Sequence, residues 1–193
     1  DPEAFSIKDT SIELDKWIVL KAINLQKEIL DHYNKFNFHI ISQLIHGFCV
    51  NELGSFYLDV IKDRQYTCKK DSAERKSAQN SMYVILQMLL SWIAPICPHT
   101  AEEAWSHVPK NSQKSIFFNK WLIIDDSEIQ QTKINLENWE KILEIKKHVS
   151  KELENKREKN IIGSSLDSDV KILCSDNLYN LLSEFDDELK FIF

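Results

Sequence analysis

The sequence predicts a mainly α-helical protein. Only three glycines and four prolines occur among 193 residues, which favours long helices over a β fold with many tight turns. Apolar residues make up 43% of the chain, enough to bury a substantial core. In several segments they recur every three or four residues, as in amphipathic helices. We therefore expect an antiparallel helical bundle over residues 1–135, followed over residues 136–193 by a long helix and a small α/β appendage cut short.

Two long helices are predicted at the start of the chain. The first covers residues 12–33, and its apolar stripe consists of Leu14, Ile18, Ala22, Leu25, Ile29 and Tyr33. After a break near residues 34–37, a second apolar pattern predicts a helix that reaches Lys62. Gly47 and Gly54 interrupt it, each at a cost of about 1 kcal/mol against alanine. We expect them at a local bend or a close helix contact.

Capping patterns predict where the next two helices begin. Asp71 and Glu74 stand three residues apart in a capping-box arrangement, which predicts the start of a third helix. Its expected stripe ends before Pro95, which cannot continue the helix, and consists of Met82, Ile85, Leu86, Leu89 and Ile93. Residues 100–103 repeat the pattern and predict a short helix that ends near His107.

The remainder of the chain changes character twice. Residues 109–134 are irregular, and we expect a loop strapped onto the bundle by Phe117, Phe118 and Trp121. A helix over residues 136–159 follows, with Trp139, Ile142, Leu143, Val149 and Leu153 facing inward. Beyond Gly163, Val170, Ile172 and Cys174 alternate with polar residues, which predicts a half-buried strand. A short helix near residues 178–182 and a further strand from Leu189 complete the predicted appendage.

Composition excludes several classes of protein. No apolar run approaches the roughly 20 residues that span a bilayer, and the first residues lack the features of a signal peptide. We expect a cytoplasmic, monomeric protein without membrane contact. Cys49, Cys68, Cys97 and Cys174 lie far apart, which predicts reduced thiols rather than disulfides or a zinc knuckle. The chain begins without methionine and ends on an apolar run, so we expect a piece of a longer polypeptide.

Charge is distributed unevenly. The net charge of −6 argues against a general nucleic-acid binder, because such binding needs clustered cations. Residues 62–76, however, carry a net charge of +3, whereas residues 164–193 carry −5. A basic strip on an acidic body steers a polyanion towards one face.

The basic strip is the candidate binding site. We expect it to contact the phosphates of a folded RNA, with an amide and an aromatic ring reading unstacked bases; its residues are Lys62, Arg64, Gln65, Tyr66, Lys69, Lys70, Arg75 and Lys76. The alternative is a solvated surface on which Lys62 and Arg64 pair with Asp59 or Asp63 and Tyr66 packs on the bundle. Weaker RNA-contacting candidates on the last long helix are Lys146, Lys147, Lys151 and Arg157.

Three segments resemble one protein family. SFYLDVIKDRQYT at residues 55–67, PICPHTAEEAW at 95–105 and IGSSLDSDV at 162–170 are similar, in this order, to blocks in the anticodon-binding region of bacterial-type isoleucyl-tRNA synthetases. The resemblance covers the chain from about Asp15 onwards. It implies a domain that grips the anticodon stem and loop of the isoleucine tRNA, within an enzyme that joins isoleucine to that tRNA using ATP. The KDRQYT wording distinguishes isoleucine from the related valyl and leucyl enzymes, whose equivalent domain is an alternative identification.

The same resemblance separates recognition from catalysis. The ATP-binding signatures of class I synthetases are absent, as is any glycine-rich phosphate loop, so we expect no catalytic residue and no cofactor in this chain. His32, His39 and His46 do not match known ligand spacings, and no metal site is predicted. ATP, magnesium and a zinc-binding cysteine-rich segment are implied for the parent enzyme, and the rest of that polypeptide is an expected partner. The rival hypothesis is a helical module that binds partner proteins, which the acidic tail would suit.

Overall fold

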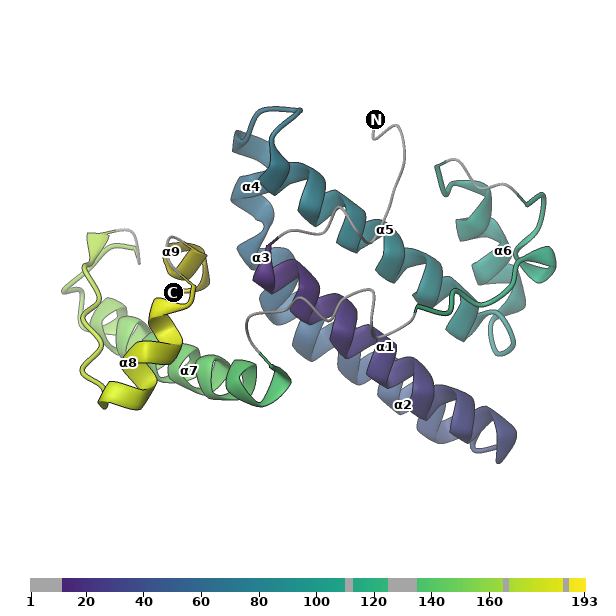
Figure 1. The fold of residues 1–193 in the computed structure, drawn as a ribbon, viewed down its shortest axis with the longest axis horizontal. Coiled ribbons are helices and arrows are strands. Elements are labelled where there is room, and N and C mark those ends of the chain that lie inside the picture. The colour runs from purple at the N-terminus through teal and green to yellow at the C-terminus, as the bar shows by residue number, and fades with distance from the viewer. Residues whose placement is uncertain (1–11, 110–112, 125–134, 165–166, 186–187) are drawn as a thin grey trace. The chain divides into compact units, whose positions relative to one another are not determined.

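The computed structural model describes residues 12–109, 113–124, 135–164, 167–185 and 188–193. The chain divides into two compact units, Asp1–Thr132 and Lys133–Phe193, and each is considered separately. Both units are helical (Figure 1), so the predicted mainly α fold is confirmed. No helix in the described part of the chain is long and apolar enough to cross a membrane.

Helix α1 (Glu13–Asn34) is the central helix of the first unit. Its predicted stripe is buried at Leu14, Ile18, Ala22 and Ile29, and burial extends to Trp17 and Gln26. It packs mainly on α5 and, through a tight turn, on α2. Phe36 in this turn adopts a positive φ of 56°, which reverses the chain within a few residues. The result is the expected antiparallel hairpin.

The second helical stretch changes from an α-helix to a π-helix and back. It consists of α2 (Phe38–Gly47), the π-helix η2 (Phe48–Tyr57), α3 (Leu58–Val60) and α4 (Lys62–Thr67). The predicted single helix to Lys62 is therefore interrupted. Aromatic rings from η2 anchor the stretch, because Phe56 packs edge-on against Trp17 with ring centroids 5.3 Å apart, and Phe48 against Trp92 at 5.9 Å.

Helix α5 (Ala73–Ile93) begins one residue away from the predicted cap. Ser72, not Asp71, is the N-cap residue, and its hydroxyl accepts a hydrogen bond from the Arg75 amide at 3.2 Å. The predicted stripe is also displaced. Of its members only Ile85 is buried, whereas Leu86 is 37% exposed. Small side chains face α1 instead, and the buried residues include Ser77, Ala78, Ser81, Val84, Met88 and Trp92. Serine is not a hydrophobic signal, so the apolar pattern alone pointed to the wrong face.

Helix α6 (Pro98–Ser106) starts earlier than its predicted cap at Thr100. Pro98 occupies the first turn, where a missing amide hydrogen costs nothing. Trp105 is buried, and its indole donates a hydrogen bond of 3.0 Å to the carbonyl of Gln113. Around it lies a second core cluster formed by Leu90, Ala94, Ala101, Trp105, Val108 and Ile116.

The predicted strap is held by a different residue. Ile116 in the 3₁₀ turn η3 (Ile116–Phe118) is 3% exposed, whereas Phe117 and Phe118 are 57% and 71% exposed. Glu102 on α6 fixes this turn, because its carboxylate accepts hydrogen bonds from the Ser115 hydroxyl and the Ile116 amide. Phe117 and Phe118 therefore do not strap the loop. Trp121 does pack on the bundle, with its ring 5.8 Å from that of Tyr33.

The second unit is built around α7 (Leu136–Glu158), close to its predicted bounds. Trp139 and Ile142 are buried, and Phe185 packs edge-on against Trp139 at 4.9 Å. Helix α8 (Asp176–Ser183) confirms the short helix predicted there.

The predicted strands of this unit are absent from its described residues. Leu189–Ile192 forms the short helix α9, not a strand. Ile172 and Cys174 are half-buried as the alternation predicted, but Val170 is 45% exposed, and no strand among the residues that the structure describes pairs with this segment. An alternating pattern favours a strand only where a partner supplies the hydrogen bonds of a ladder.

Candidate nucleic-acid interface

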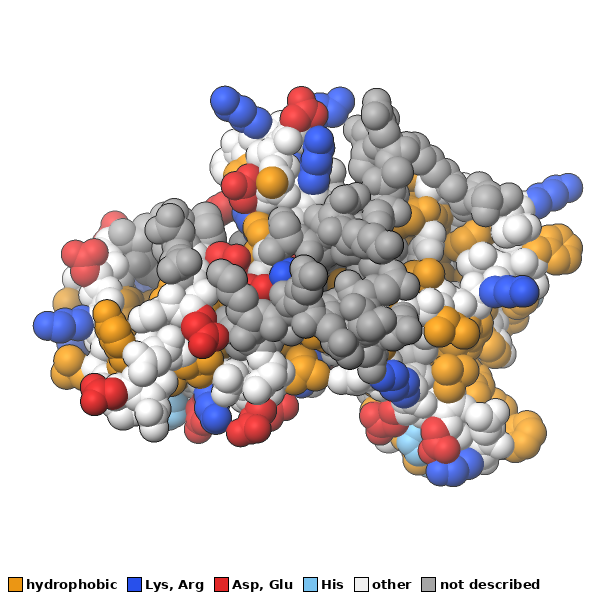
Figure 2. All heavy atoms as spheres, in the orientation of Figure 1, with side chains coloured by type: hydrophobic (Ala, Val, Ile, Leu, Met, Phe, Trp, Pro, Cys, Tyr) orange, Lys and Arg blue, Asp and Glu red, His pale blue; other side chains and the backbone are white. Residues whose placement is uncertain are grey.

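The predicted site residues of the first unit gather around one turn. They lie on α4, on the connection to α5 and on the first turn of α5, at the top of Figure 1. Figure 2 shows Lys and Arg side chains clustered over this region. The predicted residues therefore lie in one region of the first unit, but they differ sharply in exposure.

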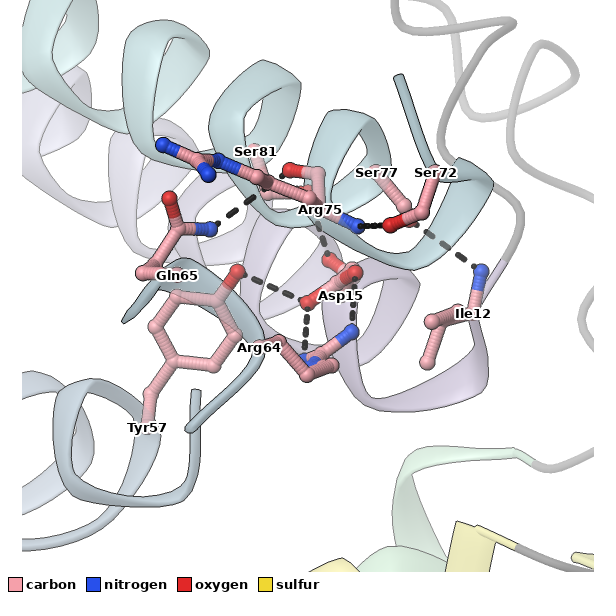
Figure 3. A network of polar contacts seen from close by, with 9 residues as sticks. All are labelled: Ile12, Asp15, Tyr57, Arg64, Gln65, Ser72, Arg75, Ser77 and Ser81. Carbon is pink, nitrogen blue, oxygen red and sulfur yellow. Dashed lines mark hydrogen bonds and ion pairs between the residues drawn. The ribbon is translucent and has the colours of Figure 1, made fainter. Parts of the chain in front are cut away.

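Arg64 is an exception that corrects the sequence prediction. Its side chain is only 3% exposed, and its guanidinium donates two hydrogen bonds of 2.9 Å to the carboxylate of Asp15 on α1. Figure 3 shows the Arg64 side chain joined to Asp15 by these two bonds. A guanidinium committed to a buried carboxylate does not reach phosphates, so we remove Arg64 from the RNA-contacting set. The alternative prediction also named the wrong partner for it, since Arg64 pairs with neither Asp59 nor Asp63.

Asp15 is the centre of a buried polar network. The Tyr57 hydroxyl donates to Asp15 Oδ1 at 2.8 Å, and the Ser81 hydroxyl donates to the Asp15 carbonyl at 3.4 Å. Burial, reinforced by the Asp15 carboxylate, raises the pKa of Tyr57 well above its ordinary value. The network ties together α1, η2, α4 and α5 (Figure 3), and so fixes the orientation of α4.

Gln65 and Arg75 stabilise the turn between α4 and α5. The Gln65 amide donates to the Arg75 carbonyl at 3.5 Å, and the Arg75 guanidinium donates to the Cys68 carbonyl at 3.3 Å. Both side chains are half-buried. Their described contacts are therefore with the protein's own backbone.

Lys62 pairs with Asp59 on an exposed surface, as the alternative prediction proposed. Its ammonium lies 2.6 Å from the Asp59 carboxylate, one helical turn earlier, and both side chains are more than half exposed. This hydrogen bond, with the charge of Asp59, raises the pKa of Lys62. An exposed pair of this kind contributes little to stability.

Four side chains of the predicted strip are exposed to solvent. Tyr66 is 85% exposed, contrary to the alternative in which it packs on the bundle. Lys69, Lys70 and Lys76 are exposed, and the described residues give them no ion-pair partner. An exposed aromatic ring at the end of α4, with exposed lysines on the turn that follows and on the first turns of α5, supplies the groups that stack on an unpaired base and neutralise phosphates.

The weaker candidates on α7 also comprise cations with a partner in their own unit and cations that are exposed. Lys146 donates to the Ile192 carbonyl at 2.5 Å, and Arg157 pairs with Glu154 at 2.8 Å. Lys147 and Lys151 are exposed. Half of the named cations on this helix are therefore engaged within their own unit.

Metal chemistry has no support in the described residues. No group of three or more His, Cys, Asp or Glu side chains there is arranged to hold an ion. The ring of His32 instead contacts the Asn37 amide, with Nδ1 at 3.3 Å.

The residue that sequence reasoning missed is Asp15. A signal existed, because an acidic residue stands inside the apolar stripe of α1, between Leu14 and Ile18. A second signal was the spacing of Tyr57, Val60 and Arg64, which follow one helical face at intervals of three and four. Together these patterns indicate a buried carboxylate and a buried cation.

The chain belongs to the family of anticodon-binding domains of tRNA ligases. The family described as "Anticodon-binding domain of tRNA ligase" matches residues 15–172, which include Tyr66 and the three exposed lysines.

Individual relatives are isoleucine–tRNA ligases. The chain is 40% identical to that of Methylococcus capsulatus over 193 residues, covering 100% of this chain and 21% of the relative. It is 44% identical to that of Ruthia magnifica over 186 residues, covering 94% and 19%. The Francisella philomiragia ligase is 42% identical over 193 residues, covering 100% and 21%. The chain thus spans about a fifth of the length of these relatives.

Proposed function

We propose that this chain binds the anticodon stem-loop of an isoleucine tRNA, as the anticodon-binding domain of an isoleucine–tRNA ligase. The complete ligase would attach isoleucine to that tRNA with ATP. The observation that carries the proposal is the exposure of Tyr66 on α4 and of Lys69, Lys70 and Lys76 on the following turn and the start of α5, in a chain that belongs to this family.

The exposed residues contact the RNA, and the buried residues position α4. Lys69, Lys70 and Lys76 neutralise phosphates, and Tyr66 stacks on a base that leaves the stack of the loop. Arg64 and Asp15 contact no RNA and hold α4 in place. Because α4 is fixed before binding, little conformational entropy is lost when the RNA docks.

The wider assignment is part of the same proposal. The partners are the tRNA and the remaining ligase polypeptide, and the compartment is the cytoplasm. ATP, magnesium and zinc belong to that complete ligase, and the described residues of this chain offer no metal-ligand cluster to hold such an ion.

Salt-dependent binding tests the proposal. The affinity of this chain for an isoleucine anticodon stem-loop is measured by fluorescence anisotropy over a range of salt concentrations, beside a stem-loop with altered anticodon bases. We expect preference for the natural loop and a steep loss of affinity with salt. The variant Lys69→Ala/Lys70→Ala should weaken both RNAs and lower the slope of log affinity against log salt by about 2.

Matched controls separate the alternatives. Lys35→Ala removes an exposed lysine that pairs with Asp31 at the other end of α1, and should leave the slope unchanged. Equal slopes for the double variant and the unaltered chain would refute contact through this surface. Salt-independent binding of a protein partner, without RNA binding, would support the interaction-module hypothesis instead.

A further inference from the structure

The 3₁₀ turn η3 exposes two neighbouring aromatic rings to solvent. Phe117 is 57% exposed and Phe118 is 71% exposed, although burial of a phenylalanine ring is favourable. Of the three residues of the turn, Ile116 is the one that is buried. The two rings therefore do not serve the core, and an exposed pair of large apolar side chains is a candidate for contact with a ligand.

Hydrogen bonds hold this turn in one conformation. The Glu102 carboxylate on α6 accepts hydrogen bonds from the Ser115 hydroxyl at 3.0 Å and from the Ile116 amide at 3.1 Å. The Ser115 hydroxyl also accepts a hydrogen bond from the Phe117 amide at 3.3 Å. Ile116 belongs to the second core cluster. The backbone that carries the rings is thus fixed in advance, so less conformational entropy is lost when a ligand docks on them.

Lysines flank the turn on both sides. Lys114 precedes Phe117 by three residues and Lys120 follows Phe118 by two, so at most about 10 Å of chain separates each lysine from a phenylalanine. Both lysines are exposed, and the described residues give neither an ion-pair partner. They are the charged residues of the segment 113–124, which therefore carries a net charge of +2 in a chain of net charge −6. Aromatic faces combined with positive charge are the groups that bind single-stranded RNA.

We propose that η3 is a second RNA-contacting site of the first unit. An unpaired base of the bound tRNA stacks on Phe117 or Phe118, and the two flanking lysines neutralise phosphates. The positive charge favours RNA over an apolar protein surface, because burying two unpaired lysines against such a surface costs free energy. The identity of the RNA rests on the proposed function.

The two RNA-contacting sites lie far apart on the first unit. Tyr66 is on α4, next to the start of α5, whereas η3 packs with α6 near the end of α5. In Figure 1, α4 and α6 lie at opposite ends of α5, a helix of 21 residues that is about 30 Å long. One RNA held at both ends of α5 has its orientation on the bundle fixed as well as its affinity increased.

Variants of the rings test the stacking. The affinity of the 193-residue chain for a complete isoleucine tRNA transcript is measured by filter binding. Phe117→Ala/Phe118→Ala should weaken binding about tenfold or more, whereas Phe117→Trp/Phe118→Trp keeps two aromatic faces and should bind almost as well as the unaltered chain. Tyr179→Ala is the matched control, because it removes a 65% exposed ring on α8, within the acidic residues 164–193. It should leave the affinity unchanged, and equal losses in the alanine variants of η3 and α8 would contradict the proposal.

Variants of the lysines test the two-point contact. Lys114→Ala/Lys120→Ala should lower the slope of log affinity against log salt by about 2, as Lys69→Ala/Lys70→Ala does at the other site. The variant that combines all four changes should lower it by about 4, because contacts this far apart act independently. A loss that appears only when both pairs are removed would mean that the RNA uses the two surfaces alternately, and would refute the two-point contact.

Photocrosslinking identifies what the ring contacts. Phe118 is replaced by the photoreactive analogue p-benzoylphenylalanine, the complex with the transcript is illuminated, and the cross-linked nucleotide is located by primer extension. We expect an unpaired nucleotide. Cross-links confined to base-paired nucleotides, or no cross-link to bound RNA, would overturn the stacking contact.

The outcomes separate this proposal from the proposed function. Normal transcript binding by the Phe117→Ala/Phe118→Ala protein, with intact preference for the isoleucine anticodon, would reject the site at η3 alone. Binding that depends on the two rings but shows no preference for the isoleucine anticodon would reject the proposed function and leave this site standing. Absence of all RNA binding by the unaltered chain would reject both.

Discussion

The guanidinium of Arg64 on α4 donates two hydrogen bonds of 2.9 Å to the carboxylate of Asp15 on α1, although 49 positions separate the two residues in the chain. Their side chains are 3% and 0% exposed, so water does not screen the pair. Arg64, although it belongs to the basic strip, therefore has a structural role: it fixes α4, and the exposed lysines follow that helix in the chain.

Breaking this pair should destabilise the protein strongly. Arg64→Met leaves the Asp15 carboxylate buried without its cation, for which we expect a loss of about 3–5 kcal/mol in the free energy of unfolding. Urea unfolding measures it. As a control, Lys62→Ala removes an exposed pair and should cost less than about 1 kcal/mol. An Arg64→Met protein that kept its stability but lost RNA affinity would restore Arg64 to the interface.

Tyr66 should act through its ring and not through its hydroxyl. In Tyr66→Ala the stacking surface is lost, which should weaken stem-loop binding by about 1–3 kcal/mol. Tyr66→Phe keeps the ring and should bind almost as well as the unaltered chain. Because Tyr66 is 85% exposed, neither change should alter the unfolding midpoint appreciably. Equal losses of affinity in both variants would indicate a hydroxyl contact instead of stacking.

Ile116, and not its aromatic neighbours, should hold the loop after α6. Ile116→Ala removes a side chain that is 3% exposed in the second core cluster, and should cost about 2–5 kcal/mol. Phe117→Ala and Phe118→Ala should each change the free energy of unfolding by less than about 0.5 kcal/mol. Chemical unfolding of the three variants tests the order, and a larger cost for either phenylalanine would revive the predicted strap.

The sequence predicted the helices well and their contacts less well. Helical periodicity placed α1 and α7 within a residue or two of their observed ends, because long amphipathic stripes depend on local spacing. It missed the role of Arg64, because a run of cations in sequence does not reveal that one of them faces a carboxylate on another helix. It also displaced the stripe of α5, where Ser77 and Ser81 pack against α1 in positions that a hydrophobic pattern skips.

In the candidate site, too, local features could be predicted from the sequence and tertiary contacts could not. The exposure of Lys69 and Lys70 could be predicted from the sequence, because it depends only on a local cluster of charges at a turn. Gln65 and Arg75 are held by backbone carbonyls of the turn, a contact that depends on tertiary geometry. The predicted strands failed for a related reason, since alternation at Ile172 and Cys174 describes one strand and says nothing of its partner.

Alkaline pH should lower the stability of the fold through two tyrosines, of which Tyr57 is buried and Tyr33 is half-buried. Burial raises the pKa of Tyr33 to about 12 and that of Tyr57 well above its ordinary value, whereas tyrosines in an unfolded chain ionise near pH 10. The unfolded state therefore loses these protons first, so the stability they contribute is complete below about pH 10 and falls as the pH rises through the folded values. Urea unfolding between about pH 8 and 11.5 should show this decline. Tyr57→Phe should flatten it, and curves of identical slope would show that Tyr57 ionises alike in both states.

The two glycines of the second helical stretch should respond oppositely to alanine. At Gly47 an added Cβ would meet nothing nearer than the Asn51 amide nitrogen at 3.9 Å. Gly47→Ala should therefore stabilise the protein by about 0.5–1 kcal/mol, because alanine loses less conformational entropy on entering a helix. At Gly54, within the π-helix, the Cβ would stand 3.0 Å from the Cys49 carbonyl oxygen, and a backbone atom yields less readily than a flexible side chain. Gly54→Ala should accordingly lower the free energy of unfolding. Thermal and urea unfolding of both variants would decide the matter: equal stabilisation by both would mean that the wide turn of η2 does not require glycine.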